Sequence, residues 1–549
     1  MKRILLISFY DQICLGARQI ISVLKQKGFQ AHLLVVKSER TAIIPSIDPN
    51  SKHYQIKVGP NLIGCGEDIN PLTKNELSLF KDHITRIRPH AIGLSCRTVN
   101  VEIAKQISSA IRSVSINTHI IAGGIGPTIE PRKFLKFVDY VCIGEGESFF
   151  PTFFSNKATN VPGLFWKEIG VIKFTPPSKP SSLNELPPPD REPSFKHILE
   201  DDKIKPLSFV GEAYDIFCSR GCPSTCTYCY ACQTNKIVNK YKANYPKWRN
   251  RSITSCIDEL VWAKDNYNIR YVRFKDSIFT ANKKWVISFL KEYDKHIQLP
   301  FHCFLDQRFV DEEIIKNLKS SGLEYTTVGI QSVNERIRNK VMGRNIKDSE
   351  LVNYAQMLSK YKLQIKYDII SWNPFETKEH LLQGINFISQ LPKGIIVTIY
   401  QLKIFPNSDI HNIIQTIKPS PLPDGEYMRF AILYQMILHS KKLEKKAFEL
   451  LNEGKEIDVH KLNKIFLDEI EAFDDGYRLL SRRNINKGER LKVTDFKIVV
   501  SKDSGLQRKD IETFLHNPLC QSISRDTILE RKHFYGSYES DNRNTCVVN

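Results

Sequence analysis

The sequence predicts an α/β protein with an N-terminal doubly wound, Rossmann-like domain, then a partial (β/α)6 barrel, then a mostly helical C-terminal region. Two series of short apolar strands alternate with helices, a proline-rich stretch separates the series, and a helical pattern follows residue 405. A chain of 549 residues is long enough for two or three domains with cores of their own. We place the domains at 1–158, 208–405 and 406–549, with a linker at 159–207.

The first series has five apolar segments of strand length, and small residues follow most of them. Ligands of doubly wound sheets lie at the carboxyl ends of the strands, where small residues let them approach the backbone. Glycine at a strand end is also ordinary turn chemistry. Strands are expected at 3–9, 31–36, 91–96, 119–124 and 140–147, and the residues at or after their ends include Ser95, Gly123, Gly124, Gly126, Gly144 and Glu145.

A proline-rich stretch separates the two series. Residues 174–195 contain seven prolines in 22 positions, which break both helix and sheet. We therefore expect an extended linker here.

The second series predicts a barrel with its site at the rim formed by the strand ends. Expected strands cover residues 212–217, 271–274, 301–305, 325–330, 364–370 and 394–405. Polar residues close several of these strands, among them Asp276, Arg308, Gln331 and Ser332. Beyond them, residues 427–451 and 460–483 have helical patterns.

The overall charge permits several kinds of partner. The net charge is +19, which suits nucleic acid, an acidic membrane surface or an anionic substrate, but also a lysine-rich genome with no special partner. No apolar run reaches the roughly 18 residues of a membrane-spanning helix, and the start lacks the long apolar region of a signal peptide. We expect a cytoplasmic protein without a membrane span.

The segment CSRGCPSTCTYCYAC, residues 218–232, holds five of the 13 cysteines. Zinc sites use paired C-x2-C units at separate places, and no clear second pair exists elsewhere in the sequence. A bacterial ferredoxin run fails because position 236 is lysine. The pattern C-x3-C-x2-C fits in one register only, with Cys222, Cys226 and Cys229.

Three thiolates on one loop can hold three irons of a [4Fe–4S] cluster and leave the fourth iron open. An open coordination position is typical of catalytic rather than structural metal sites. We therefore predict Cys222, Cys226 and Cys229 as ligands, and Cys218 and Cys232 as non-ligands.

With this loop the sequence resembles the radical SAM superfamily, including the aromatic Tyr228 before the last cysteine. Residues 120–150 are similar to the end of the cobalamin-binding domain that precedes the barrel in one large subfamily. The connector and barrel segments of that subfamily resemble, in order, residues 183–192, 248–260, 272–285, 329–337 and 367–377. The resemblance covers roughly residues 1–405.

The resemblance implies that the open iron binds S-adenosylmethionine (SAM), which the reduced cluster cleaves to methionine and a 5′-deoxyadenosyl radical. It implies SAM contacts from Tyr228, Asp276, Arg308, Gln331 and Ser332; the alternative is a set of polar rim residues with no ligand. It implies a cobalamin site lined by Ser95, Gly123, Gly124, Gly126, Gly144 and Glu145.

One motif departs from the cobalamin pattern. Many cobalamin enzymes carry D-x-H-x-x-G, whose histidine is the lower cobalt ligand, whereas residues 11–16 have Ile13 in its place. Relatives with a radical SAM domain often lack this histidine too. We expect cobalamin without a protein histidine below the cobalt; the alternative is a vestigial domain with no cofactor.

We therefore predict a cobalamin-dependent radical SAM enzyme that methylates an unactivated carbon or phosphorus of a small molecule, with a flavodoxin- or ferredoxin-type electron donor. A second hypothesis is a radical SAM cyclase, ring-contracting or oxidative enzyme without methyl transfer. A third is a tRNA-modifying enzyme, but its N-terminal and C-terminal domains differ from those expected here, so we do not expect a nucleic acid partner. A fourth is a non-catalytic Fe–S or cobalamin-binding protein. The catalytic acid and base are not assigned.

Overall fold

The structure is a computed structural model. It describes residues 2–38, 54–58, 61–65, 71–115, 117–155, 160–207, 213–394 and 396–452, with short pieces beyond 452 that include Tyr477–Ser481 and Phe496–Val500. The chain divides into two compact units, Met1–Ser440 and Lys441–Asn549. None of the helices in these ranges is long and apolar enough to cross a membrane.

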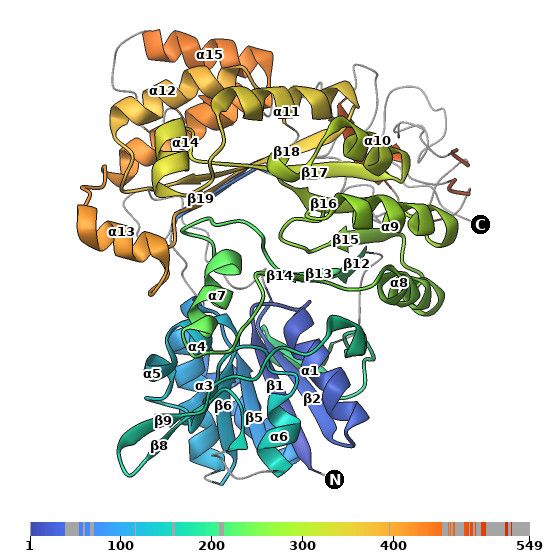
Figure 1. Ribbon diagram of the computed structural model, residues 1–549, viewed down its shortest axis with the longest axis vertical. Helices are drawn as coiled ribbons and strands as arrows, with labels where there is room; N and C mark the ends of the chain where they lie inside the picture. Colours follow the sequence, from blue (N-terminus) through green and yellow to red (C-terminus); the bar gives the residue numbers. More distant parts are fainter. Residues whose placement is uncertain are drawn as a thin grey trace, which may run out of the picture. The chain divides into compact units, whose positions relative to one another are not determined.

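A nine-stranded sheet of order β11-β10-β2-β1-β5-β6-β7-β8-β9 forms the N-terminal part (Figure 1). Six of its strands, β10-β2-β1-β5-β6-β7, are parallel, and the order reverses between β1 and β5. This is the expected doubly wound topology, with its switch point at that reversal. The bounds are β1 (Arg3–Phe9), β2 (Gln30–Val36), β5 (Ala91–Ser95), β6 (His119–Gly123) and β7 (Tyr140–Cys142).

Helices cover both faces of this sheet, because apolar residues of each strand alternate between two cores. Phe80 and Ile111 join the core on one face, and Ile21 and Phe149 join the core on the other. The helices are α1 (Leu15–Gln26), α2 (Lys74–Ile87), α3 (Val101–Val114), α4 (Ile125–Ile129), α5 (Pro131–Phe134) and α6 (Phe149–Ser155).

The expected linker, residues 159–207, is not a plain extended connection. It supplies a two-stranded hairpin at each outer edge of the first sheet: β8 pairs antiparallel with β7, and β10 pairs in parallel with β2. The proline-rich stretch connects the two hairpins. The domain boundaries themselves stay predictions. The four strands are β8 (Leu164–Glu168), β9 (Val171–Phe174), β10 (Lys196–Glu200) and β11 (Lys203–Pro206).

The second sheet is the expected partial barrel. Its six parallel strands follow one another in chain order, and helices connect most of them. The strands are β12 (Ala213–Ile216), β15 (Tyr271–Phe274), β16 (Phe301–Leu305), β17 (Leu323–Gln331), β18 (Gln364–Ser371) and β19 (Ile396–Gln401). The helices are α7 (Tyr230–Asn239), α8 (Ile253–Tyr267), α9 (Lys283–His296), α10 (Glu312–Ser320), α11 (Asp348–Lys360) and α12 (Lys378–Ser389).

An unexpected hairpin extends the barrel sheet. Strands β3 (Tyr54–Val58) and β4 (Asn61–Cys65) come from the predicted N-terminal domain, yet β4 pairs in parallel with β19. Barrel edges expose unpaired backbone groups, and this hairpin covers one of them.

The C-terminal region is largely helical where the structure describes it, with one correction. Residues Tyr477–Ser481, expected as the end of a helix, form strand β20 and pair with β21 (Phe496–Val500). The pairing partner lies outside any local sequence window, which explains the wrong prediction. The remainder of 460–483 lies mostly outside the described residues. The helices are α13 (Asp409–Ile417), α14 (Asp424–His439) and α15 (Lys441–Asn452).

The dipeptide Asp190–Arg191 anchors the connector between the sheets. The Asp190 carboxylate forms ion pairs with Lys25 at 2.8 Å and Lys196 at 2.9 Å, on the first sheet and its helix. The Arg191 guanidinium donates to the Asp215 carbonyl of β12 at 2.8 Å and lies over the Tyr214 ring. One peptide bond therefore joins a residue held by the first sheet to a residue held by the first barrel strand.

Three histidines meet where α2 packs on the first sheet. His83 of α2 lies edge-on to His197 of β10 at 5.1 Å, and His32 lies on the neighbouring strand β2. Burial lowers the pKa of His32 and of His83 to about 4, and the charge of His197 acts in the same direction on both. The folded protein therefore keeps these rings neutral.

Acid should destabilise this packing. The folded pKa of about 4 lies below the ordinary 6.5, so the unfolded state binds more protons and stability falls as pH drops from 6.5 towards 4. Each such histidine adds a slope of up to about 1.4 kcal/mol per pH unit. Urea unfolding at pH 7 and pH 5 should show a smaller pH effect in His83→Phe than in the parent. The exposed His296→Gln should match the parent; an equal pH effect in all three would contradict the assignment.

Candidate active site

The cysteine loop begins at a buried carboxylate. After β12, the Cys218 N–H donates to Asp276 at 3.2 Å, and the Ser219 hydroxyl donates to the other oxygen of the same carboxylate. Burial raises the pKa of Asp276 to about 6, against the opposing effect of these hydrogen bonds. Asp276, predicted as a SAM contact, here holds the entrance of the loop, and its SAM contact stays a prediction.

Hydrogen bonds from three sides fix the middle of the loop. The Thr227 N–H donates to the Met342 carbonyl at 3.1 Å, and its hydroxyl donates to the Val341 carbonyl at 2.7 Å. The Thr227 carbonyl accepts from the Ile410 N–H of α13 at 3.1 Å. The backbone between Cys226 and Cys229 is thus clamped before any ligand binds, which favours a preorganised site.

The three predicted ligand thiols lie together, and a fourth joins them. The Cys232 side chain is in hydrogen-bonding contact with Cys222, Cys226 and Cys229. This contact lowers the pKa of Cys226 to about 6, and nearby Arg344 and Arg308 act in the same direction against burial. The pKa of Cys222 and of Cys229 is lowered for the same first reason. Thiolates, the form that ligates iron, are therefore favoured here.

Cysteine thiolates are the usual ligands of Fe–S clusters. The loop offers three sulfurs whose pKa is lowered, on a clamped backbone, so the residues present fit such a cluster.

Two arginines and one aspartate flank the thiols. Arg308 donates to Asp306 through Nε at 2.8 Å and Nη2 at 2.7 Å, and Nη2 also donates to the Ser224 hydroxyl of the loop at 2.6 Å. Arg344 lies 3.3 Å from the same carboxylate, and its other nitrogen donates to the Tyr228 hydroxyl at 3.5 Å. The predicted SAM contacts Arg308 and Tyr228 are therefore both beside the loop.

The other two predicted SAM contacts end β17 in an irregular turn. Gln331 has a φ of +68° at a register shift between β17 and β18. Ser332 is fully buried and its hydroxyl donates to Glu376 at 2.5 Å; burial raises the pKa of Glu376 to about 8. The structure engages Ser332 with a carboxyl group, so contact of either residue with SAM remains a prediction.

A cavity of about 640 Å³ lies at the carboxyl ends of the first sheet. Five of the six predicted cobalamin residues line it: Ser95, Gly123, Gly124, Gly144 and Glu145. The sixth, Gly126, is not among the lining residues; a Cβ there would lie 2.6 Å from the Arg97 carbonyl, so this glycine permits a close backbone approach. The volume is typical of an organic-ligand site.

The opposite wall of the cavity comes from the cysteine loop. Arg220 and Gly221 line it just before Cys222, and Tyr230 lines it just after Cys229. The cavity also reaches between strands and helices of the first sheet, to Leu6, Gly93 and Phe150. In residues 11–16, which lack the histidine of the cobalamin motif, Leu15 and Gly16 line the cavity and Ile13 is not among the lining residues. The residues present therefore fit a large planar cofactor with an apolar tail, with no histidine from this segment.

Partly buried ion pairs join the two walls. Glu145 and Glu147, on the loop after β7, form pairs with Arg220 at 3.2 Å and 2.6 Å. Arg249 also pairs with Glu145, whose N–H donates to the Tyr245 hydroxyl at 3.0 Å. Burial raises the pKa of Glu145, and the arginines oppose that shift. Arg249 thus binds a carboxylate of the protein itself.

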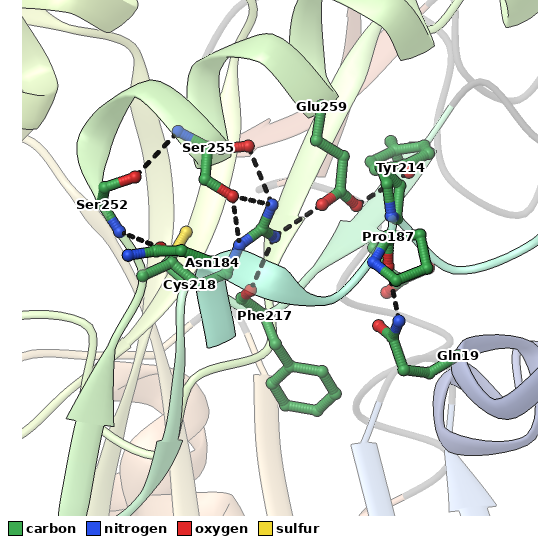
Figure 2. Close-up of polar contacts among 12 residues, drawn as sticks. Gln19, Asn184, Pro187, Tyr214, Phe217, Cys218, Ser252, Ser255 and Glu259 are labelled. Atoms are coloured by element: carbon green, nitrogen blue, oxygen red, sulfur yellow. Dashed lines mark hydrogen bonds and ion pairs between the residues drawn. The ribbon is translucent and has the colours of Figure 1, made fainter. Parts of the chain in front are cut away.

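Arg251 braces the strand that leads into the cysteine loop. Its guanidinium donates to the Phe217 carbonyl at 3.2 Å, to the Ser255 hydroxyl and carbonyl, and to Glu259 at 2.5 Å. Figure 2 shows Ser255 and Glu259 of α8 beside this group, Tyr214 beside Glu259, and Ser252, the N-cap of α8, bonded to Ser255. Arg251 thus binds carbonyl, hydroxyl and carboxylate groups of the protein itself.

Several site residues were not predicted. Sequence reasoning missed Arg220, Glu147, Tyr245, Asp306 and Arg344. A signal existed for Asp306, which follows a predicted barrel strand, and for Glu147, which belongs to a glycine-rich strand end. Nothing local marks Arg344 or Tyr245, because their partners are distant in the sequence.

Alanine at Cys222, Cys226 or Cys229 should abolish the cluster, because each removes a ligand from a clamped loop. Cys218 is fully buried beside Cys256, so Cys218→Ala should leave the iron content near that of the parent. The measurement is the iron and sulfide content per chain after anaerobic reconstitution. Circular dichroism shows whether each variant is folded. Loss of iron from folded Cys218→Ala would show that the ligand register is wrong.

Leucine at Gly123 should block cobalamin uptake. A Cβ at Gly123 would make only ordinary contact, 3.7 Å from the Cys142 Cβ, so the backbone accepts a side chain while the cavity loses volume. Overpacking of this kind costs about 1–3 kcal/mol, hence roughly tenfold or more in affinity. Cobalamin retention after gel filtration should fall in Gly123→Leu and persist in Gly123→Ala. Equal retention in both would place the cofactor elsewhere.

Family models match both halves of this site. The B12 binding domain model matches residues 71–154, and the radical SAM superfamily model matches residues 216–388. Together they cover the carboxyl ends of β5, β6 and β7 and the barrel from β12 into α12.

Curated relatives are distant and only partly covered. The chain is 25% identical to an uncharacterized methyltransferase of Pyrococcus horikoshii, over 56% of this chain and 66% of that protein. It is 22% identical to the anaerobic magnesium-protoporphyrin IX monomethyl ester cyclase of Synechocystis, over 51% and 56%. It is 23% identical to the cytidylyl-2-hydroxyethylphosphonate methyltransferase of Streptomyces wedmorensis, over 40% and 46%. The chain thus spans less than two thirds of each relative.

Solved structures share the fold. The radical SAM methyltransferase TsrM of Kitasatospora setae matches with a TM-score of 0.56 and 14% identity, over 76% of each chain. The cobalamin-dependent radical SAM enzyme OxsB matches with a TM-score of 0.57 and 14% identity, over 86% of this chain and 76% of that one. The matches to the B12 binding domain and to the radical SAM domain confirm the expected cofactor set of [4Fe–4S] cluster, SAM and cobalamin. This chain therefore carries a B12 binding domain and a radical SAM domain, as the sequence predicted.

Proposed function

We propose that this protein is a cobalamin-dependent radical SAM methyltransferase that acts on an unactivated carbon or phosphorus of a small molecule. One observation carries the proposal: a single cavity is lined by the glycine-rich strand ends of the B12 binding domain and by residues on both sides of the cysteine loop. Cofactors bound to the two walls would therefore share one space. When bound, the cluster supplies the electron that cleaves SAM, and cobalamin supplies methyl transfer.

The chain's own residues hold and separate these groups. Cys222, Cys226 and Cys229 would bind the cluster, and the glycines at and after the ends of β6 and β7 would let cobalamin approach the protein backbone closely. The pairs between Glu145, Glu147 and Arg220 keep the two walls in register. Two curated methyltransferases among the relatives support the reaction type.

A second candidate is radical chemistry without methyl transfer. The relative in Synechocystis is named a cyclase, and its match covers half of this chain. Such an enzyme would use the same cluster loop and cavity, so the product of SAM separates the two hypotheses. The flavodoxin- or ferredoxin-type electron donor and the absence of a nucleic acid partner remain predictions.

The reconstituted protein with iron, sulfide, cobalamin and a strong reductant should convert SAM into both 5′-deoxyadenosine and S-adenosylhomocysteine. Methyl transfer produces S-adenosylhomocysteine, whereas the radical step produces 5′-deoxyadenosine. Mass spectrometry of both, with Cys226→Ala as the inactive control, is the measurement. 5′-Deoxyadenosine alone would support the second candidate, and neither product would overturn the enzymatic proposal.

A further inference from the structure

The inner face of the barrel sheet is polar where barrel interiors are usually apolar. Helix α9 covers the outer face, where its Tyr293 packs against Phe274 of β15 and Phe301 of β16. The opposite, inner face carries five side chains that we call the inner row: Arg273, Lys275, His302, Tyr325 and Lys366. The interior of a barrel is normally filled by layers of bulky, branched apolar side chains. A polar layer in this place favours a ligand over a packed core.

Strand pairing places the inner row on one face. Arg273 of β15 pairs in register with His302 of β16, which pairs with Tyr325 of β17. Thr327, two residues beyond Tyr325, pairs with Lys366 of β18. Register partners and residues two apart project from the same face of a sheet. The rings of His302 and Tyr325 are accordingly stacked with their centroids 4.4 Å apart, and His302 Nε2 lies 3.2 Å from the Thr327 hydroxyl oxygen.

The cations of the inner row outnumber the carboxylates that pair with them. Arg273 donates to Asp215 at 2.6 Å, and Lys275 lies 3.9 Å from the other oxygen of that carboxylate. Lys366 lies 3.3 Å from Asp368. Burial raises the pKa of Asp368, and Lys366 opposes that shift. Three cations therefore share two carboxylates. Because charges away from water need partners of opposite sign, the row suits one further anion and disfavours a further cation.

His302 lies between these cations. Arg273 is its strand partner on one side. On the other side His302 contacts Thr327, which is the strand partner of Lys366. Burial lowers the pKa of His302 to about 3, and the charges of Lys275, Lys366 and Arg273 act in the same direction. The ring is therefore neutral, and an anion beside it would meet cations on both sides.

The inner row is accessible and is continuous with the cofactor cavity. The side chains of Arg273 and Lys275 are each 36% exposed, and that of Lys366 is 22% exposed. Among the described residues, Nε of Arg273 has no hydrogen-bond partner, so this cation has a donor to spare. Lys275 and Phe304, near the ends of their strands, line the cavity that the glycine-rich strand ends share with the cysteine loop. A ligand on the inner row would therefore lie next to the space of the cofactors.

We propose that the inner row binds the substrate and that the substrate is a small organic anion. Arg273, Lys275 and Lys366 hold its carboxylate or phospho group. The stacked rings of His302 and Tyr325 lie against its carbon skeleton. The inference rests on the proposed function, because it names the class of molecule that receives the methyl group.

Two substitutions in one ion pair should act in opposite directions. Lys366→Met removes a cation, so anion affinity should fall about tenfold or more, and Lys366→Arg should keep most of that affinity. Asp368→Asn removes the carboxylate that competes for Lys366, so anion affinity should rise about fivefold. A variant that is merely damaged cannot bind more tightly, so this rise separates a binding role from a structural one.

The test uses the full chain reconstituted with its cluster and cobalamin. The probes are three small molecules of similar shape: para-fluorobenzoate, para-fluorophenylphosphonate and the neutral para-fluorobenzamide. Fluorine NMR line broadening at fixed ionic strength gives the dissociation constant of each probe. Lys295→Met of α9, whose side chain is 67% exposed, is the matched control. Iron per chain shows that each variant holds its cluster.

Anion binding that is weaker in Lys366→Met, tighter in Asp368→Asn and unchanged in Lys295→Met supports the proposal. The anion that binds more tightly then tells a carboxylate substrate from one with a phospho group. Equal anion binding in all variants, equal binding of the neutral amide, or no saturable binding of either anion overturns the proposal.

The same preparation of the parent is assayed for 5′-deoxyadenosine and S-adenosylhomocysteine, which keeps the two proposals apart. Where both products form and the probes fail, the anion inference alone is overturned. Where neither product forms, the proposed function fails, whatever the probes do.

Discussion

The ion pairs between the loop after β7 and the start of the cysteine loop are the interaction on which the site depends. Arg220 lies in β13 (Ser219–Gly221), directly before Cys222, and binds both Glu145 and Glu147. Buried pairs cost desolvation, and breaking one partner leaves an uncompensated charge. These contacts therefore contribute more to alignment than to net stability: they place the strand ends of the first sheet opposite the cysteine loop, with the cavity between.

The second requirement is a cysteine loop that is rigid before it binds anything. Asp276 holds its entrance, Thr227 its middle and Gln233 its exit, and each contact comes from a different part of the barrel or from α13. Thiolates brought together on a mobile loop would pay an ordering cost when the metal binds. Here the loop is already partly ordered by the fold, so this cost is smaller. Nearby arginines also favour the charged sulfurs.

The two cofactor sites solve opposite physical problems. The cluster loop concentrates negative charge and balances it with guanidinium groups. At the cavity, glycines at and after the ends of β6 and β7 carry no side chain, so a large ligand can lie against the backbone. The absence of the histidine motif at residues 11–16 is consistent with this division, because the cavity wall there consists of small or apolar groups such as Leu15 and Gly16.

By itself, the sequence determined the features that depend on neighbouring residues and on the periodicity of apolar positions. Apolar runs such as residues 3–9, 271–274 and 301–305 become strands with those bounds, because a strand buried on both faces needs only a short continuous apolar segment. The C-x3-C-x2-C spacing selected three thiols in one register, and the strand ends of the first series marked five cavity residues, three of them glycines. The strands in the expected linker, the hairpin β3–β4 and strand β20 were missed, because each forms only through a partner distant in the chain.

Only the tertiary structure decided which groups meet. Arg344 and Tyr245 carry no local signal of their partners, and their roles come from packing between segments 116 and 100 residues apart. The same holds for Cys218 and Cys232, which spacing treated alike as non-ligands. The helix that starts after Cys229 turns one thiol back onto the ligands, and the strand before the loop buries the other against α8. Spacing reports distance along the chain, whereas contact depends on the direction that each element takes.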